Sequence, residues 1–265
     1  MILKYISLSS TFFLSAILSS RSQDTIKNAI IRIQIENISA TENSPSSQTE
    51  NQGFTRMIDG DIQSIIWMKN GLSKTEADLG FGKSVVYYNS LNKTTTTLFE
   101  LMGKKMGFYS NEEELNKMLR ETDSASIQRN AFNKQDVLIE YLNEEKTVAG
   151  IKCKKAIIHY QNRRLEDQQQ EVWYCPEFIL EQGIRFNELI RSASIPGIKK
   201  LKGFPMEMEI KRQNGSITKF EVQKIELNAD IKDQEFIIPS GYDIRPMSEM
   251  NQGGKGRFQF PFENN

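Results

Sequence analysis

The sequence predicts a mainly β protein built around an antiparallel sheet, with few helices. In many short runs, apolar and polar residues alternate, which is the period of a strand with one buried and one solvated face. Turn residues separate these runs at close intervals, as in a meander of antiparallel strands. No long helical crossover intervenes between the runs, and this disfavours a parallel sheet.

The N-terminus has the pattern of a signal peptide over residues 1–22. Lys4 precedes an apolar run over residues 5–18, and Ser20 and Ser22 then supply the small side chains that signal peptidase requires. Cleavage after Ser22 is expected, cleavage after Ser20 competes with it, and a retained membrane anchor is the alternative.

Export without an anchor is the expected outcome. The apolar run is shorter than the roughly 20 residues that span a bilayer, and no later run approaches that length. No Cys near the cleavage site offers a sulfur for the acyl group of a bacterial lipoprotein. We therefore expect a periplasmic or secreted protein with no transmembrane segment after signal cleavage.

Composition indicates one domain and argues against nucleic acid as a partner. Lys plus Arg and Asp plus Glu each number 34, so the chain has no basic field to hold a phosphate backbone. The roughly 240 residues that follow the cleavage site suit one large β domain. We expect this domain over residues 23–246, followed by a flexible C-terminal tail over residues 247–265.

The first six strands are expected in the N-terminal half. Ile31, Ile33 and Ile35 alternate with polar residues and mark the first strand, and the polar segment 39–53 after it is a solvated loop. Five more strand-like runs follow at residues 62–68, 72–78, 84–88, 94–102 and 106–109.

One helix is expected to interrupt the strands. Ser110 can cap its start and Glu113 can complete a capping box, after which Leu115, Met118 and Leu119 form one apolar stripe. Such a helix either closes one side of the sheet or acts as a movable lid over a cavity. A second, weaker helix is expected over residues 186–191.

The last hairpin places five apolar residues on one face, namely Met206, Met208, Ile210, Phe220 and Val222. A two-residue turn would set Met208 opposite Glu221 and mix the two faces. A three-residue loop over residues 214–216 sets Ile210 opposite Phe220 and Met208 opposite Val222, so the pattern favours the longer turn. Between Val222 and Ile225 the alternation of apolar and polar residues shifts by one position, which predicts a β-bulge near Lys224.

Two cysteines, Cys153 and Cys175, fall on neighbouring predicted strands. If their hairpin is symmetric about Arg164, they lie opposite each other, and an exported protein with an even cysteine count favours a disulfide. In the alternative register Ile158 faces Val172, and the two thiols are then diagonal.

No catalytic or metal-binding constellation is found in the sequence. His159 is the only histidine, so neither a Ser-His-Asp triad nor a His-rich metal site can form within one chain, and it is interpreted as structural. Asp59-Gly60-Asp61 has too few carboxylates for calcium and is interpreted as a turn. Phosphate-binding loops and nucleophile motifs are missing. We therefore expect no enzyme, no metal and no cofactor.

Four motifs in order resemble a known family. They are TVAGIKCKKA at residues 147–156, VWY at 172–174 with Pro176-Glu177, GFP at 203–205, and FIIP at 236–239 with Gly241-Tyr242. In this order they resemble an uncharacterised family of exported envelope proteins that is related to the GLPGLI family and similar in fold to the LolA/LolB lipoprotein carriers. Members usually have Thr at the position of Cys175, so the family does not predict the disulfide.

The resemblance implies a strongly curved antiparallel sheet, an unclosed barrel, with short helices packed across its concave side. In the carriers, that concavity binds the acyl chains of lipoproteins. No functional residue of the carriers can be transferred to this chain by motif. The resemblance therefore implies the fold and suggests a class of ligand.

Two functions of different class follow. In the first, a lipid, a lipoprotein acyl chain or another apolar ligand lies in the concavity, against Met206, Met208, Ile210, Phe220 and Val222. In the second, these residues fill a solid core, and the protein is a structural or interaction protein of the envelope that binds another envelope protein. A hydrolase, the third class considered, would need a polar cleft with converging carboxylates.

Overall fold

A computed structural model describes residues 23–38, 61–80, 82–101, 103–114, 137–161, 167–180, 195, 197–211 and 215–251. Within them the strands are β1 Asp24–Ile26, β2 Asn28–Ile38, β3 Ile62–Lys69, β4 Leu72–Asp78, β5 Gly82–Asn89, β6 Thr94–Leu101, β7 Lys104–Asn111, β8 Leu138–Val148, β9 Ile151–Gln161, β10 Asp167–Cys175, β11 Phe178–Leu180, β12 Phe204–Lys211, β13 Ile217–Leu227 and β14 Asp243–Pro246. The 3-10 helices are η1 Ile198–Lys200, η2 Asp233–Phe236 and η3 Met247–Asn251.

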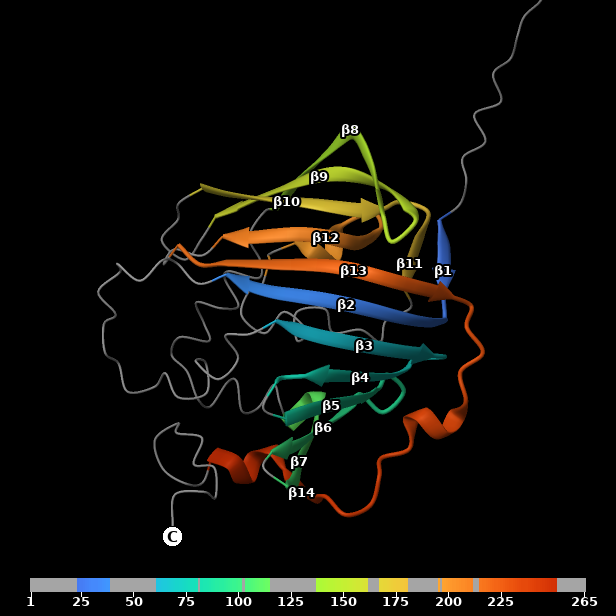
Figure 1. The fold of residues 1–265 in the computed structure, drawn as a ribbon, viewed down its shortest axis with the longest axis vertical. Helices are drawn as coiled ribbons and strands as arrows, with labels where there is room; N and C mark the ends of the chain where they lie inside the picture. Colours follow the sequence, from blue (N-terminus) through green and yellow to red (C-terminus); the bar gives the residue numbers. More distant parts are fainter. Residues whose placement is uncertain are drawn as a thin grey trace, which may run out of the picture.

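Twelve strands form one open sheet, in the order β14-β7-β6-β5-β4-β3-β2-β13-β12-β10-β9-β8. All neighbours are antiparallel except β14 and β7, which run parallel. Figure 1 shows the strands stacked along the long axis of the molecule, with β8 at one end and β14 at the other. Because β8 and β14 are edges and do not pair, the sheet is not closed into a barrel. The predicted fold class, mainly β with an unclosed antiparallel sheet, is confirmed.

The strand pattern of the N-terminal half agrees with the prediction. Ile31, Ile33 and Ile35 are buried on β2, and the five predicted runs agree with β3 to β7 to within two residues at each end. Neighbouring strands are joined by tight turns, and at the first of them Asn70 and Gly71 both have positive φ, as in a type I′ hairpin. The predicted loop over residues 39–53 lies outside the described residues.

The hydrophobic core lies on one face of the sheet, over the neighbouring strands β3, β2, β13, β12, β10, β9 and β8. A continuous buried cluster joins residues of β2, β3, β9, β10, β12 and β13. Ile195, Ile198 and Leu201, from the segment around η1, complete this cluster, so a short 3-10 helix packs on the core side of the sheet. We call the opposite side of the sheet the outward face.

The predicted helix after β7 begins one residue later than expected. Ser110 lies within β7, and Asn111 caps the helical residues 112–114 instead, because its Oδ1 accepts a hydrogen bond from the Glu114 backbone N–H at 2.7 Å. Asn and Ser are both strong capping residues, and the strand continues through Ser110. The residues of the predicted apolar stripe and the helix predicted at 186–191 lie outside the described residues.

A C-terminal segment crosses the outward face of β3 to β7. Lys69 Nζ donates to Ile231 O and to Asp233 Oδ1, both at 2.7 Å. Lys74 Nζ lies 2.6 Å from Glu76 Oε1 and 3.0 Å from Glu235 Oε2, and it sits over the ring of Trp67. These contacts hold η2 against β4, and the chain then pairs with β7 as β14.

Candidate functional site

The predicted ligand-binding face is buried. Met206, Phe220 and Val222 are 0% exposed, Met208 is 2% exposed and Ile210 is 7% exposed, and all five belong to the hydrophobic core cluster. Side chains that are this well buried are covered by other residues. The face is therefore apolar and buried, as the alternation predicts, and ligand binding at these residues stays a prediction.

The predicted register of the last hairpin is wrong by two residues. Met208 lies opposite Phe220, and Ile210 lies opposite Thr218, with residues 212–216 between the two strands. A shift of two residues keeps every side chain on its face, so the face is unaffected. The apolar pattern did not predict this register because Thr218 takes an inward position, where it is 2% exposed and its hydroxyl donates to Asn37 Oδ1 at 2.9 Å.

The predicted β-bulge is present. The register between β13 and β2 shifts between Val222 and Lys224, so that Gln223 has no partner residue in the ladder. Val222 pairs with Ile33, and Ile225 pairs with Ile31, so both sides of the bulge keep apolar residues toward the core.

Cys153 and Cys175 are buried free thiols on neighbouring strands. Val172 pairs with Ala156, and the same register, continued along β10, sets Cys175 opposite Cys153. The alternative register, with Ile158 facing Val172, is thereby wrong. No disulfide joins the two sulfurs in the structure, and their oxidation in the exported protein stays a prediction.

Both thiols are in an environment that favours the protonated form. Burial raises the pKa of Cys153 to about 11, and the neighbouring Cys175 adds to the shift. Burial raises the pKa of Cys175 as well. At neutral pH, neither side chain is therefore the thiolate that nucleophilic or metal-binding chemistry needs.

His159 lies on the outward side of β9 with one polar contact. Its Nε2 is 3.3 Å from Glu140 Oε2 on β8, and its side chain is 38% exposed. Within the described part of the chain, His159 belongs to no group of side chains placed to hold a metal ion. The contact joins two strands and fits the structural interpretation.

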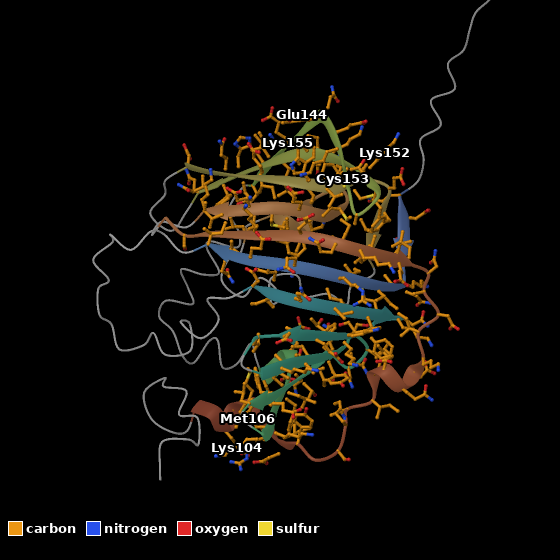
Figure 2. All side chains as sticks on the ribbon, in the orientation of Figure 1. Lys104, Met106, Glu144, Lys152, Cys153 and Lys155 are labelled. Atoms are coloured by element: carbon orange, nitrogen blue, oxygen red, sulfur yellow. The ribbon has the colours of Figure 1, made fainter. Side chains whose placement is uncertain are left out.

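Charged residues gather on the outward face at the β8 end of the sheet. Figure 2 shows Glu144 and Lys155 in this region. Lys155 Nζ lies 3.0 Å from Glu171 Oε2 and 3.7 Å from Glu144 Oε2. Lys146 pairs with Glu207, and its Nζ lies 4.6 Å from the centroid of the Trp173 ring.

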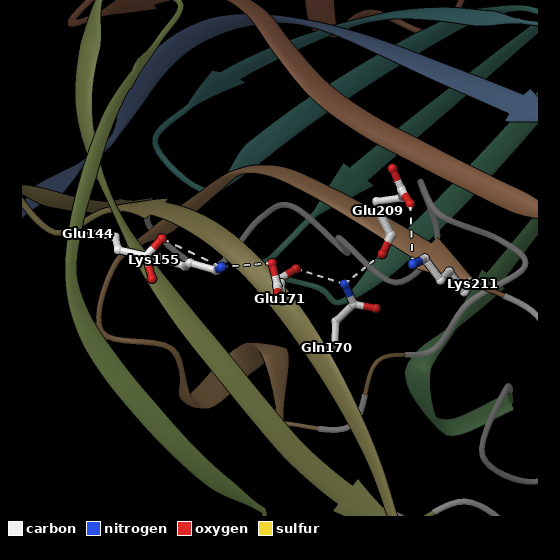
Figure 3. Close-up of polar contacts among 6 residues, drawn as sticks. All are labelled: Glu144, Lys155, Gln170, Glu171, Glu209 and Lys211. Carbon is white, nitrogen blue, oxygen red and sulfur yellow. Dashed lines mark hydrogen bonds and ion pairs between the residues drawn. The ribbon is translucent and has the colours of Figure 1, made fainter.

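A line of polar contacts continues from these ion pairs across β10 to β12, as Figure 3 shows. Gln170 Nε2 donates to the backbone oxygens of Glu171 at 2.7 Å and Glu209 at 2.9 Å. Glu209 Oε1 is 4.0 Å from Lys211 Nζ. Several partly exposed ion pairs thus connect strands of the sheet on the outward face.

Two hollows with charged lining residues open on the outward face. The first, of about 420 Å³, crosses β13, β2, β3, β4 and β5, and its charged lining residues are Arg32, Glu76, Asp78 and Lys83. The second, of about 340 Å³, is lined by four carboxylates and one ammonium, from Glu36, Glu207, Glu209, Glu221 and Lys219. Gln34 lines both, so the two hollows adjoin.

These hollows were not predicted from the sequence. Their residues come from six strands, β2, β3, β4, β5, β12 and β13, and each residue alone has the pattern of an ordinary solvated strand position. The alternation could have indicated the charged lining of the second hollow. Glu207, Glu209, Lys219 and Glu221 alternate along the same hairpin with the five apolar residues, so they share the opposite face.

The described part of the chain contains no group of three or more His, Cys, Asp or Glu side chains placed to hold a metal ion. Among the same residues, no helix has the length and apolar character needed to cross a membrane.

Comparisons with known proteins give weak structural likeness. No protein-family model matches the chain, and no curated protein matches it. The crystal structure of PNGF-II matches over 83% of this chain and 31% of its own, with 13% identity and a TM-score of 0.36. This chain thus spans less than a third of the length of PNGF-II.

Two further solved structures match at similar levels. MucB in complex with MucA(peri) has 10% identity and a TM-score of 0.31, over 80% of this chain and 54% of its own. A putative outer membrane lipoprotein-sorting protein domain from Vibrio parahaemolyticus has 8% identity and a TM-score of 0.23, over 81% of this chain and 91% of its own. The relation to the GLPGLI family stays a prediction.

Proposed function

We propose that this chain is an exported, non-enzymatic protein of the cell envelope that binds another protein through the outward face of its sheet. The observation that carries the proposal is the contrast between the two faces. The inward face is apolar, with Met206, Phe220 and Val222 fully buried, while two adjoining hollows with charged lining residues open on the outward face.

The chemistry of the second hollow indicates the kind of partner. Four carboxylates and one ammonium line it, so a basic patch on the partner would complement its charge. Complementary charges speed association and fix orientation more than they add affinity. The neighbouring Lys146 and Lys155, each paired with a carboxylate, supply ion pairs that a partner's charges can rearrange.

Photo-crosslinking in cells tests this proposal. A photoreactive residue at Gln34, which lines both hollows, should crosslink to one envelope protein, whereas the same residue at Leu91, 87% exposed on a turn, should not. Glu221→Lys should abolish the crosslink, because it reverses one of the hollow's charges. The matched control Asp230→Lys makes the same charge change at an exposed position and should leave the crosslink intact. A crosslink that is equally strong at Leu91, or unaffected by Glu221→Lys, would contradict the proposal.

A carrier of a lipid or other apolar ligand is the second candidate. The observation in its favour is that Met68, Met206 and Met208 all belong to the core cluster, and flexible thioether side chains can yield to an apolar ligand. Native mass spectrometry before and after delipidation distinguishes the two functions. A protein binder has the mass of the polypeptide in both samples, whereas a carrier loses mass on delipidation.

A further inference from the structure

We propose that the first half of β8 accepts an added strand, and that this strand is the Phe-rich C-terminal segment of a second copy of this chain. The inference goes beyond the proposed function, because it concerns the edge of the sheet and self-association rather than the outward face.

The first half of β8 is a regular edge, and no described strand pairs with its outer side. β8 ends the twelve-stranded sheet, and β9 is its only strand neighbour among the described residues. Leu138 to Tyr141 pair step by step with β9, so their other backbone groups point away from the sheet in an unbroken row. Leu138 is 68% exposed and Tyr141 is 36% exposed. Such an edge is a template for a further strand.

The second half of β8 is protected, and this limits the site to the first half. Between Tyr141 and Glu145 the strand advances four residues while β9 advances only two, so the edge bends there. Glu144 lies 3.7 Å from Lys155, and Glu145 lies 3.8 Å from Lys154. A bulge and charged side chains are the usual features that prevent edge pairing.

On the core side, the side chains of this edge pack against apolar and aromatic residues. Ile139 packs against the core cluster, and the Tyr141 ring meets the ring of Tyr174 at 5.5 Å. The Tyr141 hydroxyl accepts a hydrogen bond from the Lys202 backbone N–H at 2.9 Å, which fixes the ring from below. A strand added here would therefore contact Ile139 and Tyr141 on its core side, and Leu138 and Glu140 on its outward side.

The C-terminal sequence Arg257-Phe258-Gln259-Phe260-Pro261-Phe262 matches this requirement. Its three Phe side chains have the period of a strand and would all lie on the core side, while Arg257 and Gln259 would face outward near Glu140. Lys255 and Arg257 also complement the carboxylates of β8.

Pro261 fits an outermost strand. In a strand, alternate residues direct their backbone groups to opposite sides, so when the Phe residues bond to β8, Pro261 points away from it. Its missing N–H then costs no hydrogen bond, and it prevents the pairing of yet another strand.

The strand is assigned to a second copy because of where the chain ends. The described chain stops at Asn251 in η3, which contacts β7 and β14 at the far end of the sheet from β8. Figure 1 shows these two ends on opposite sides of the molecule. Eleven strand spacings make about 50 Å along the sheet, whereas six residues from 252 to 257 span at most about 20 Å. Such pairing is head-to-tail and gives rings or chains of molecules.

Light scattering with size-exclusion chromatography on the protein that begins at Gln23 tests the inference. We expect association that grows with concentration and disappears on removal of residues 252–265. Phe260→Pro should weaken it at least tenfold, because it removes an N–H directed at β8, while Pro261→Ala should not weaken it. Leu138→Lys, at an exposed edge position, should also weaken it at least tenfold, and Leu91→Lys, its matched control, should leave it unchanged.

A labelled synthetic peptide of residues 254–265 provides the second measurement. It should bind the protein that lacks residues 252–265, and Leu138→Lys should abolish this binding. A monomer at every concentration together with no peptide binding would overturn the inference. Association that survives removal of the tail would overturn it too, since another surface would then be responsible. The peptide could also bind the shortened chain while the full chain stays monomeric and does not bind it. That result would show that the tail docks within its own molecule, and it would overturn the assignment to a second copy.

Discussion

Met208→Glu is the substitution that most sharply tests whether the inward face is a filled core. Met208 is 2% exposed and lies between Val172 and Phe220 on the neighbouring strands. Losing the buried thioether costs about 1.5–3 kcal/mol, by the usual value for a buried Met side chain. Burying a neutral carboxyl without a partner costs a further 1–3 kcal/mol or so. The free energy of unfolding should thus fall by roughly 2.5–6 kcal/mol even where the new carboxyl is protonated.

The loss should grow with pH. Burial disfavours the charged form, so the introduced carboxyl has a pKa in the folded protein above its value of about 4.3 in the unfolded chain. Between these two pKa values the folded state binds more protons than the unfolded state, and stability therefore falls as pH rises. The difference from wild type should be smallest below about pH 4.3 and should increase up to the folded-state pKa.

Urea unfolding at pH 4 and pH 7 measures this difference. Lys211→Glu on the same strand is the matched control, because the Lys211 side chain is 78% exposed, and its unfolding free energy should change by less than about 1 kcal/mol. A loss below about 1 kcal/mol for Met208→Glu at pH 7, with no dependence on pH, would refute the reasoning, since the face would then be accessible to water.

Three further predictions concern other parts of the molecule. Gly203→Ala should strongly destabilise the protein in thermal unfolding, because a Cβ at Gly203 would clash with the backbone oxygen of Cys175. The control Gly80→Ala has no atom within 4 Å of the new Cβ, so it should cost only about 1–2 kcal/mol for its positive φ. Cys153 and Cys175 should be oxidised in the exported protein, with a stabilisation of about 3 kcal/mol for a loop of this size, and two reactive thiols in the denatured protein would refute this pairing. Export should remove the residues through Ser22, and an intact mass that retains the signal or includes an acyl group would contradict that.

Much of the fold could be predicted from the alternation of apolar and polar residues. That pattern decides which side of a strand is buried, and it therefore located β3 to β7 and the inward face of β12 and β13. It does not decide which residues lie opposite each other when the buried row contains a polar residue. Thr218 lies on the buried side with its hydroxyl bonded to Asn37, and the predicted pairing of Ile210 with Phe220 failed for this reason.

The outward hollows could not be predicted, because they depend on how six strands lie beside one another. The resemblance motifs gave a different kind of information. The GFP motif, for instance, coincides with a backbone contact: Gly203 lies so close to Cys175 that no larger residue fits without a shift. The glycine of that motif is therefore explained by close packing against the Cys175 backbone, and a ligand is not needed to explain it.

Titration of the purified protein with a fluorescent fatty acid tests the central claim, that the inward face is filled, most directly. We expect no saturable binding to the wild type, and we expect Met208→Trp, which overpacks a filled core, only to lower the unfolding free energy by roughly 1–3 kcal/mol. Saturable one-to-one binding to the wild type, lost in a Met208→Trp variant that is as stable as the wild type, would contradict the account and establish an apolar cavity on this face.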